Sequence, residues 1–423
     1  MTRAWSLALV GSLVAGAAVA QTVPDGSPAL QVPSAYRRGP QFRIDPFRHT
    51  AVPQWGFVIE GGGIAGNNAL NLSDIGALIV LADSDAVLTS DLLNAVALVP
   101  AGNAAVGDGQ AEGGLYVGGP FGEHVSVGIT AQGRAYGSYV VDRDAVAMLR
   151  EGNSVRQTFD VGQTTGTGLG TGELGVHALV RLEPIGSQDG ARLSVGFGGR
   201  YIEPLAYGRE ETTLRDDVPI LVSGDSIAAH VDLHAEYTPD VEFGRGSGYA
   251  VDVLVRVEWP TSGLYLEALA TNLGKVTVDG VERSTLAFSV ATTDLGEVVD
   301  SLDTADFIVQ DTTSVSVSLP RVLRFSAGAW ANRYLQLDAS ASLPIGGDFD
   351  VPVAVDLWSP WRFMPILPIR LGLVLGGTGG IGYTAGLGVE TRHFYLGMLG
   401  GSFGGLFKDA TGVAGRFELG VFF

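Results

Sequence analysis

The sequence predicts an all-β protein, a single antiparallel transmembrane β-barrel of about 14 strands, within a range of roughly 12 to 16, with short loop helices. Hydrophobic residues make up 46% of the 423 residues and charged residues only 17%, and 61 residues are glycine. After residue 20, no run of apolar residues approaches the ~20 residues that a transmembrane helix needs. The hydrophobic residues instead alternate with polar ones, as they do in strands that face lipid on one side.

Two strands show this alternation most clearly. In residues 249–258, Val251, Val253, Val255 and Val257 alternate with polar positions, and we expect the valines to face lipid. Residues 230–237 alternate in the same way. The polar positions of the two strands then face the lumen and are the candidate lumen-facing residues: His230, Asp232, His234, Glu236, Asp252, Arg256 and Glu258.

Period-2 patterns predict about sixteen strands in all, of which two short ones are surplus to a 14-stranded barrel. The long connectors 85–110, 142–172, 205–226 and 292–311 are expected outside the cell, and the short turns 119–123, 185–190 and 391–392 in the periplasm. Helices are expected at 89–98 and 144–151. The expected strands are 55–59, 112–119, 124–133, 174–183, 191–204, 230–237, 249–258, 263–273, 282–291, 313–328, 333–343, 351–358, 367–377, 380–390, 393–401 and 412–423.

The first residues have the pattern of a cleaved secretory signal peptide at 1–20. Arg3 supplies the positive charge, residues 4–14 are apolar, and Ala18-Val19-Ala20 is a small-residue cleavage site. Residues 21–53 contain six prolines and no sustained period, which indicates an extended periplasmic N-terminal tail. The barrel is then expected to span 54–423, in the outer membrane of a Gram-negative bacterium.

The last strand carries Phe417, Leu419, Val421 and Phe423 on one face. A strand that is apolar on one face and ends on Phe resembles the C-terminal strand of bacterial outer-membrane barrels. We expect these four residues to close the barrel and to act as the signal read by the barrel-insertion machinery.

The formal net charge of −19 argues against nucleic acid as a partner. Two interpretations of the acidic residues remain: a cation-favouring lumen, or solvation of surface loops, which the many acids in predicted loops favour. The chain has no cysteine, so it has neither disulfides nor a cysteine-ligated metal.

The motifs of catalytic sites are matched only by chance in this glycine-rich chain. Residues 377–382 fit GxGxxG, but the residues that follow alternate as a strand, whereas a dinucleotide site needs a helix there. Gly400-Gly401-Ser402-Phe403-Gly404 fits GxSxG, but no histidine follows it. His230 and His234 would stand about 13 Å apart on a strand, too far to share a metal. We therefore expect no enzyme activity, no catalytic or metal-binding residues and no cofactor.

Four short motifs lie along the chain: Asn67-Asn68-Ala69-Leu70, Leu149-Arg150-Glu151-Gly152-Asn153, Thr271-Asn272-Leu273-Gly274, and Ser318-Leu319-Pro320 followed by Phe325-Ser326-Ala327-Gly328. Together they resemble a family of outer-membrane barrels of unknown function in Bacteroidetes-type bacteria, itself similar to FadL-type and PorV-type barrels. The resemblance implies an outer-membrane location and a barrel fold, and it brings no catalytic residue.

Two functions are compatible with these features. The first is a channel or transporter for a small hydrophobic solute, and the second is a non-transporting barrel that acts as a scaffold or assembly partner of a secretion or envelope complex. The expected partners are outer-membrane lipid, the barrel-insertion machinery and a hydrophobic small-molecule ligand, and the barrel is expected to be a monomer.

Overall fold

The computed structural model describes residues 46–48, 54–69, 71, 99, 103–151, 157–160, 162, 164–182, 190–214, 219–223, 226–259, 263–292, 308–332, 335–349, 354–364, 367–391, 393–406 and 409–423. The predicted signal peptide, most of the predicted N-terminal tail and the predicted helix 89–98 lie outside these residues.

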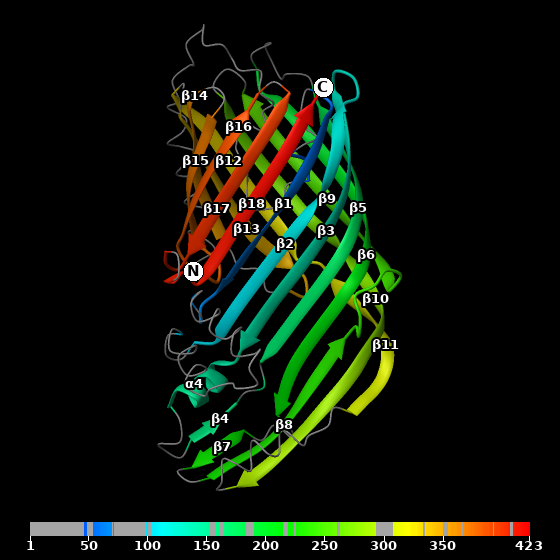
Figure 1. The fold of residues 1–423 in the computed structure, drawn as a ribbon, viewed down its shortest axis with the longest axis vertical. Helices are drawn as coiled ribbons and strands as arrows, with labels where there is room; N and C mark the ends of the chain where they lie inside the picture. The colour runs from blue at the N-terminus through cyan, green and yellow to red at the C-terminus, as the bar shows by residue number, and fades with distance from the viewer. Residues whose placement is uncertain are drawn as a thin grey trace.

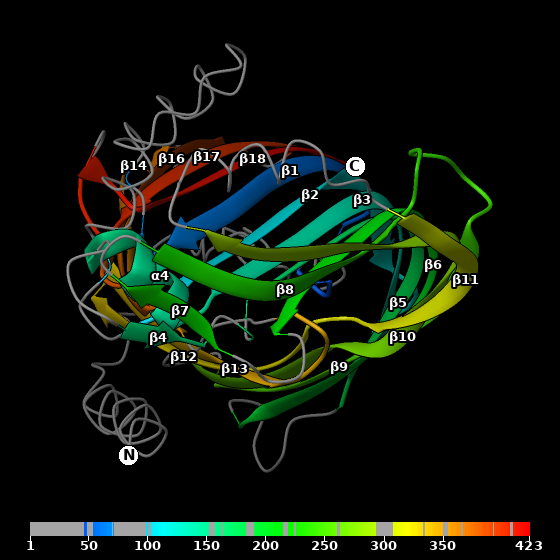
Figure 2. The ribbon, with the colours of Figure 1, turned by 90° about the horizontal axis from the view of Figure 1, so that it is seen from below.

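One antiparallel sheet contains every described strand, and its strands run obliquely around a common axis (Figure 1; Figure 2). The strands are β1 (Gly56–Asn67), β2 (Ala105–Pro120), β3 (Val125–Val141), β4 (Gln157–Phe159), β5 (Thr165–Arg181), β6 (Arg192–Leu214), β7 (Ile220–Ser223), β8 (Ser226–Tyr237), β9 (Gly246–Trp259), β10 (Leu264–Thr292), β11 (Ile308–Ser318), β12 (Arg321–Asn332), β13 (Leu335–Gly346), β14 (Ala354–Met364), β15 (Leu367–Gly376), β16 (Gly382–Glu390), β17 (Phe394–Phe403) and β18 (Gly412–Phe422).

The sheet closes on itself because β1 pairs with both β2 and β18. At the seam, Gly56 is opposite Phe422 and Gly66 is opposite Gly412. Beyond the strand pair, the backbone N–H of Phe423 donates to the carbonyl oxygen of Trp55 at 2.9 Å. The predicted antiparallel β-barrel is confirmed.

Around the ring, the described strands occupy fourteen positions, in agreement with the predicted number. Both β8 and β9 pair with β6 on one side and with β10 on the other, so together they fill one position. In the same way, β11 and β12 both pair with β10. The two shortest strands stand outside the ring, because β4 pairs with β7 and β7 pairs with β8.

The predicted strands 263–273 and 282–291 prove to be one strand, β10. Between them the chain does not turn: its pairing with neighbouring strands shifts at Ala270/Leu273 and again at Val278/Val281. Asn272 and Gly280 have positive φ values of 60° and 70°, which fit a bulge. The predicted strand 313–328 is divided at Leu319-Pro320 into β11 and β12, because proline has no N–H to donate to a ladder.

The chain enters and leaves the barrel at one end, which we call the terminal end. Its connections are short: Phe121 N–H donates to Val125 O, and Phe422 N–H donates to His393 O. At the opposite end, the loop end, β6, β8, β10 and β11 extend into a small sheet with β4 and β7 (Figure 1). Strands therefore extend into parts of the predicted connectors 85–110, 142–172, 205–226 and 292–311. β4 and β7 have only three and four residues, too few to show a clear period-2 pattern, so the sequence placed them in loops.

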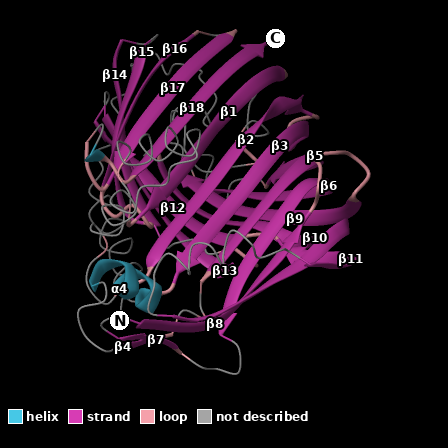
Figure 3. Ribbon diagram, turned by 60° about the horizontal axis from the view of Figure 1, so that its bottom comes forward, coloured by secondary structure: helices cyan, strands magenta, loops and turns pink. Residues whose placement is uncertain are grey.

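One helix, α4 (Arg143–Glu151), packs against the small sheet of the loop end (Figure 3). It confirms the predicted helix at 144–151. Asp142 caps it, since its Oδ1 accepts the N–H of Asp144 at 2.7 Å. Within the described residues, no helix has the length and hydropathy needed to cross a membrane.

The two faces of the barrel wall differ sharply in chemistry. On the outside, large apolar side chains are exposed, including Ile129 and Val176 at 61% and Leu387 at 63%. On the inside, charged residues are buried, and Asp252 and Glu418 are both 0% exposed. The alternation of residues along each strand produces this division, as β18 shows with a buried residue at every second position.

Candidate functional site

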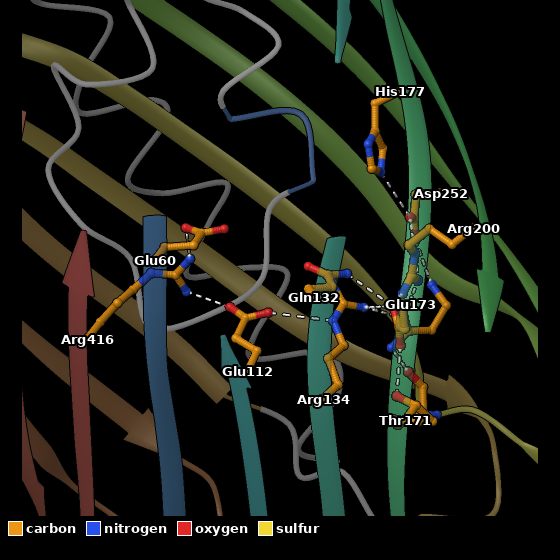
Figure 4. Close-up of polar contacts among 12 residues, drawn as sticks. Glu60, Glu112, Gln132, Arg134, Thr171, Glu173, His177, Arg200, Asp252 and Arg416 are labelled. Atoms are coloured by element: carbon orange, nitrogen blue, oxygen red, sulfur yellow. Dashed lines mark hydrogen bonds and ion pairs between the residues drawn. The ribbon is translucent and has the colours of Figure 1, made fainter. Parts of the chain in front are cut away.

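A band of charged side chains lines the inside of the wall at mid-height. We call it the charged belt: Glu60 on β1, Glu112 on β2, Arg134 on β3, Glu173 on β5, Arg200 on β6, Asp252 on β9, and Arg416 and Glu418 on β18. Figure 4 shows the sequence of contacts that runs from Arg416 across the neighbouring strands to Asp252.

Arg416 holds together the carboxylates at the seam of the barrel. Its guanidinium contacts Glu60, lies 2.7 Å from Glu112 Oε1, and donates through Nε to Glu418 Oε1 at 3.0 Å. Glu60 and Glu418 are directly opposite each other in the register of β1 and β18. Two like charges at such a position repel each other, and the guanidinium of Arg416, which contacts both carboxylates, offsets this repulsion.

Glu173 and Asp252 are held by Arg200 in the next part of the belt. Arg200 Nε and Nη2 donate to the two oxygens of Asp252 at 2.9 and 3.1 Å, and its Nη1 contacts Glu173. Arg134 lies between the two groups, 3.6 Å from Glu112 and 3.4 Å from Glu173. From Glu112 to Asp252 the charges alternate, so each buried carboxylate there has a guanidinium partner.

Small residues on the inner face make room for these long side chains. A Cβ at Gly175 would lie 2.5 Å from Thr130 Oγ1 and 2.9 Å from Arg200 Cγ. No real Cβ approaches another atom so closely, so a side chain there would displace Arg200. Part of the glycine content of the chain therefore serves to accommodate the belt.

Asn272 joins the belt to the irregular part of the wall. Its backbone N–H donates to Asp252 at 2.9 Å, its Oδ1 accepts from Arg200 at 2.6 Å, and its Nδ2 donates to the carbonyl oxygen of Pro320 at 2.9 Å. The bulge in β10 and the break between β11 and β12 are thus tied to each other and to the belt. Two of the motifs noted in the sequence, around Asn272 and Pro320, meet at this point.

A short N-terminal segment, Pro46-Phe47-Arg48, lies inside the barrel on the terminal side of the belt. Phe47 is 0% exposed and belongs to what we call the terminal-end apolar cluster. Arg48 is 3% exposed and donates from Nη1 and Nη2 to the two oxygens of Glu418 at 2.6 and 2.7 Å. The other members of the cluster are Val58, Tyr116, Leu179, Leu254, Leu269, Tyr395 and Phe422.

His177 lies beside Phe47 and is fully buried. Its ring meets the Phe47 ring edge to face, with centroids 5.6 Å apart and planes at 84°. His177 Nε2 is 3.9 Å from Asp252 Oδ2, which is too long for a direct hydrogen bond. Neither ring nitrogen has a hydrogen-bond partner among the described residues.

Apolar residues fill the interior on the other side of the belt as well. This loop-end apolar cluster includes Tyr136, Ile202 and Val276, and Phe349 from the connector after β13 packs against Tyr136 with ring centroids 5.8 Å apart. The described interior is therefore layered, with charged residues between two apolar regions.

The predicted lumen-facing residues occupy three different places. Asp252 and Arg256 are buried inside the wall, where Arg256 Nε donates to Glu267 Oε2 at 2.7 Å. Glu258 is only partly buried, near the terminal end. The remaining four, His230, Asp232, His234 and Glu236, lie on β8 in the sheet of the loop end, away from the belt.

On β8 these polar side chains pair with residues of β10. His234 Nδ1 lies 3.1 Å from Thr285 Oγ1. Glu236 forms an ion pair with Arg283, with 2.7 Å between Oε1 and Nε. Glu236 also lies 3.5 Å from the hydroxyl of Tyr207, a member of the loop-end apolar cluster, so this face of β8 is on the lumen side. Among the described residues, no group of three or more His, Asp or Glu is arranged to hold a metal ion.

The four residues singled out in the last strand, Phe417, Leu419, Val421 and Phe423, alternate with buried residues of β18 and face outward. Their alternate neighbours Arg416 and Glu418 were not identified as site residues, nor were the belt residues of β1 to β6. The available signal was an isolated charged residue at an inward position of a glycine-rich strand, as at Glu112 and Glu173.

The chain was compared with known proteins. No protein-family model and no curated protein sequence matches it. Among solved structures it is similar to the toluene transporter TodX of P. putida, with 7% identity, a TM-score of 0.48 and 96% of each chain covered. It is also similar to a Pseudomonas aeruginosa FadL homologue, with 12% identity, a TM-score of 0.45 and 94% of this chain and 95% of that chain covered.

A third similar structure is the translocator domain of the autotransporter NalP from Neisseria meningitidis, with 9% identity and a TM-score of 0.35 over 87% of this chain and 88% of that chain. Identities of 7–12% transfer neither a solute nor a mechanism to this chain.

Proposed function

We propose that this protein is an outer-membrane β-barrel that passes a small hydrophobic solute. The observation that carries the proposal is the inverted distribution of polarity in the wall. A barrel that is soluble in water buries apolar residues and exposes polar ones. Here leucine, isoleucine and valine are exposed around the outside, while paired arginine and glutamate side chains are buried inside.

A lipid bilayer accounts for this distribution. Exposed apolar side chains lose no free energy against hydrocarbon, whereas in water so large an apolar surface would aggregate. Pairing of β1 with β18 closes the ring and satisfies the backbone groups of the first and last strands, as a bilayer demands. The signal-peptide pattern of residues 1–20 supports export to the outer membrane.

The solute class follows from the interior. Buried apolar side chains lie inside the wall on both sides of the belt, so a passage opened there would be lined mainly by apolar residues. A solute with apolar surface would be favoured in both regions, whereas a free ion would find its charge compensated only at the belt. This arrangement favours a small, mainly hydrophobic solute over an inorganic ion.

The second candidate function, a scaffold that transports nothing, is favoured by a different observation. The belt and the segment Pro46-Phe47-Arg48 fill part of the interior with side chains that are paired to each other. Such an interior suits a barrel whose task is to hold a partner rather than to open.

Two measurements test the proposal. Fractionation places the protein: we expect the mature chain in the outer membrane, extracted only by detergent, and recovery from the periplasm without detergent would refute the membrane location. Uptake of a labelled long-chain fatty acid into vesicles with lipopolysaccharide in the outer leaflet then tests transport. We expect several-fold faster uptake than into vesicles carrying heat-denatured protein. Equal uptake, together with co-purification of a partner protein, would favour the scaffold.

A further inference from the structure

The segment Pro46-Phe47-Arg48 is bound inside the wall in the way a small ligand is bound. It contributes no strand to the barrel, and the residue that Arg48 contacts is 370 positions away in sequence. Phe47 and Arg48 are nonetheless more deeply buried than most of the wall. Each side chain occupies its own subsite, one apolar and one anionic.

The apolar subsite is shaped for an aromatic ring. Phe47 belongs to the terminal-end apolar cluster, whose other members come from β1, β2, β5, β9, β10, β17 and β18, and its ring meets that of His177 edge to face. The floor is Gly196 on β6, where a Cβ would lie 2.8 Å from two ring carbons of Phe47. Only glycine at this position lets a flat ring lie against the wall.

The anionic subsite is the carboxylate of Glu418. It is fully buried, and Arg48 binds both of its oxygens in the paired geometry that guanidinium and carboxylate prefer. Within the belt, the wall supplies more carboxylates than guanidiniums. The carboxylates are those of Glu60, Glu112, Glu173, Asp252 and Glu418, and the guanidiniums are those of Arg134, Arg200 and Arg416.

We propose that these two subsites form a binding site for small amphipathic cations that carry an aromatic ring next to a guanidinium or ammonium group, and that Phe47-Arg48 is the tethered occupant with which such a ligand competes. The site needs an added cation because the wall alone leaves its belt with an excess of negative charge. The inference goes beyond the proposed transport function, since binding at this site does not require the ligand to cross the membrane.

The test uses a ligand that reproduces the occupant. The probe is N-acetyl-phenylalanyl-arginine amide, and its control is the same compound with citrulline in place of arginine, which keeps the shape and removes the charge. Binding is measured by calorimetric titration in detergent with the full chain and with the vacated variant Phe47→Ala/Arg48→Ala. Heat-modifiable migration on gels shows that each variant is folded.

We expect the vacated variant to bind the arginine probe at least about tenfold more tightly than the parent does, because the tethered occupant no longer competes. The citrulline control should bind about tenfold more weakly than the arginine probe. Adding Glu418→Gln to the vacated variant should abolish this preference. A folded vacated variant that binds neither compound, or both equally, would overturn the proposal and leave the segment a structural closure of the barrel.

A matched pair of glycine variants tests the aromatic subsite separately. In the vacated background, Gly196→Ala should weaken binding of the arginine probe by about tenfold, because the new methyl group occupies the place of the ring. Gly199→Ala on the same strand is the control, since nothing lies within 4 Å of a Cβ there. Equal binding by both variants would contradict the ring position. These experiments measure binding constants, whereas the proposed function is tested by uptake into vesicles. Either proposal can therefore fail without the other.

Discussion

At the scale of single residues, each arginine of the belt serves more than one carboxylate. Arg200 is the clearest case, because it contacts Asp252 through two nitrogens, Glu173 through a third, and the side chain of Asn272 as well. A buried carboxylate without its cation is strongly unfavourable, so the loss of one guanidinium affects several strands at once.

Replacing Arg200 with methionine should therefore destabilise the barrel by about 3–5 kcal/mol, the usual result of removing one partner of a buried ion pair. Urea unfolding of the protein in lipid vesicles, followed by tryptophan fluorescence, measures the change. Arg209→Met is the matched control on the same strand, because the Arg209–Glu211 pair is exposed and should contribute less than about 1 kcal/mol. Similar losses in the two variants would show that the belt does not stabilise the fold.

At the scale of the element, β9 shows how one strand separates lipid from interior. Val251 and Val255 are exposed on the outside, while Asp252 and Arg256 are buried inside. In register, Val253 pairs with Phe197 of β6, near the middle of the exposed apolar residues of that strand. We infer that Val253 lies near the mid-plane of the bilayer.

An arginine at Val253 should cost roughly 2–4 kcal/mol in free energy of unfolding, the cost of a charge facing lipid at the mid-plane. Ser247→Arg is the control, since Ser247 is exposed near the loop end of the same strand and an arginine there should cost about 0–1 kcal/mol. Unfolding in vesicles compares the two. If the two variants lose the same free energy of unfolding in vesicles, the outside of β9 does not face lipid.

At the scale of the whole molecule, closure depends on contacts between the first and last strands. The backbone N–H of Phe423 bonds to Trp55 O, but its side chain is exposed and packs little against the barrel. The ring of Phe423 is thus available to another molecule, which is consistent with the insertion signal expected from the sequence.

Phe423→Ala should therefore have different effects in two settings. In cells it should lower the amount of heat-modifiable protein in the outer membrane several-fold, because the insertion machinery loses its signal. Refolding of the pure variant into detergent micelles should match the parent, because the backbone contact remains. Phe121→Ala, which removes another exposed ring at the terminal end, should be neutral in both assays. Normal insertion of Phe423→Ala in cells would exclude the signal.

The barrel and most of its strands could be predicted from the sequence because every second residue of a strand in the wall meets the same surroundings. The belt could not, since Arg416 and Glu112 are 304 positions apart and meet only through the register of β18, β1 and β2. For β8 the alternation was recognised, but alternation does not show height along the barrel. The polar residues of β8 lie in the sheet of the loop end, so their distance from the belt could not be predicted from the alternation.

The pairing of β1 with β18 also has a consequence for the time course of folding. Its partners are separated by most of the chain, with Gly56 opposite Phe422, so the contact that completes the ring is among the least local in the molecule. Non-local pairing is slow, and until it forms both edge strands offer unpaired backbone groups to other chains. Until residues 412–422 pair with β1, the sheet stays open along its first strand, and such an open edge is prone to aggregation.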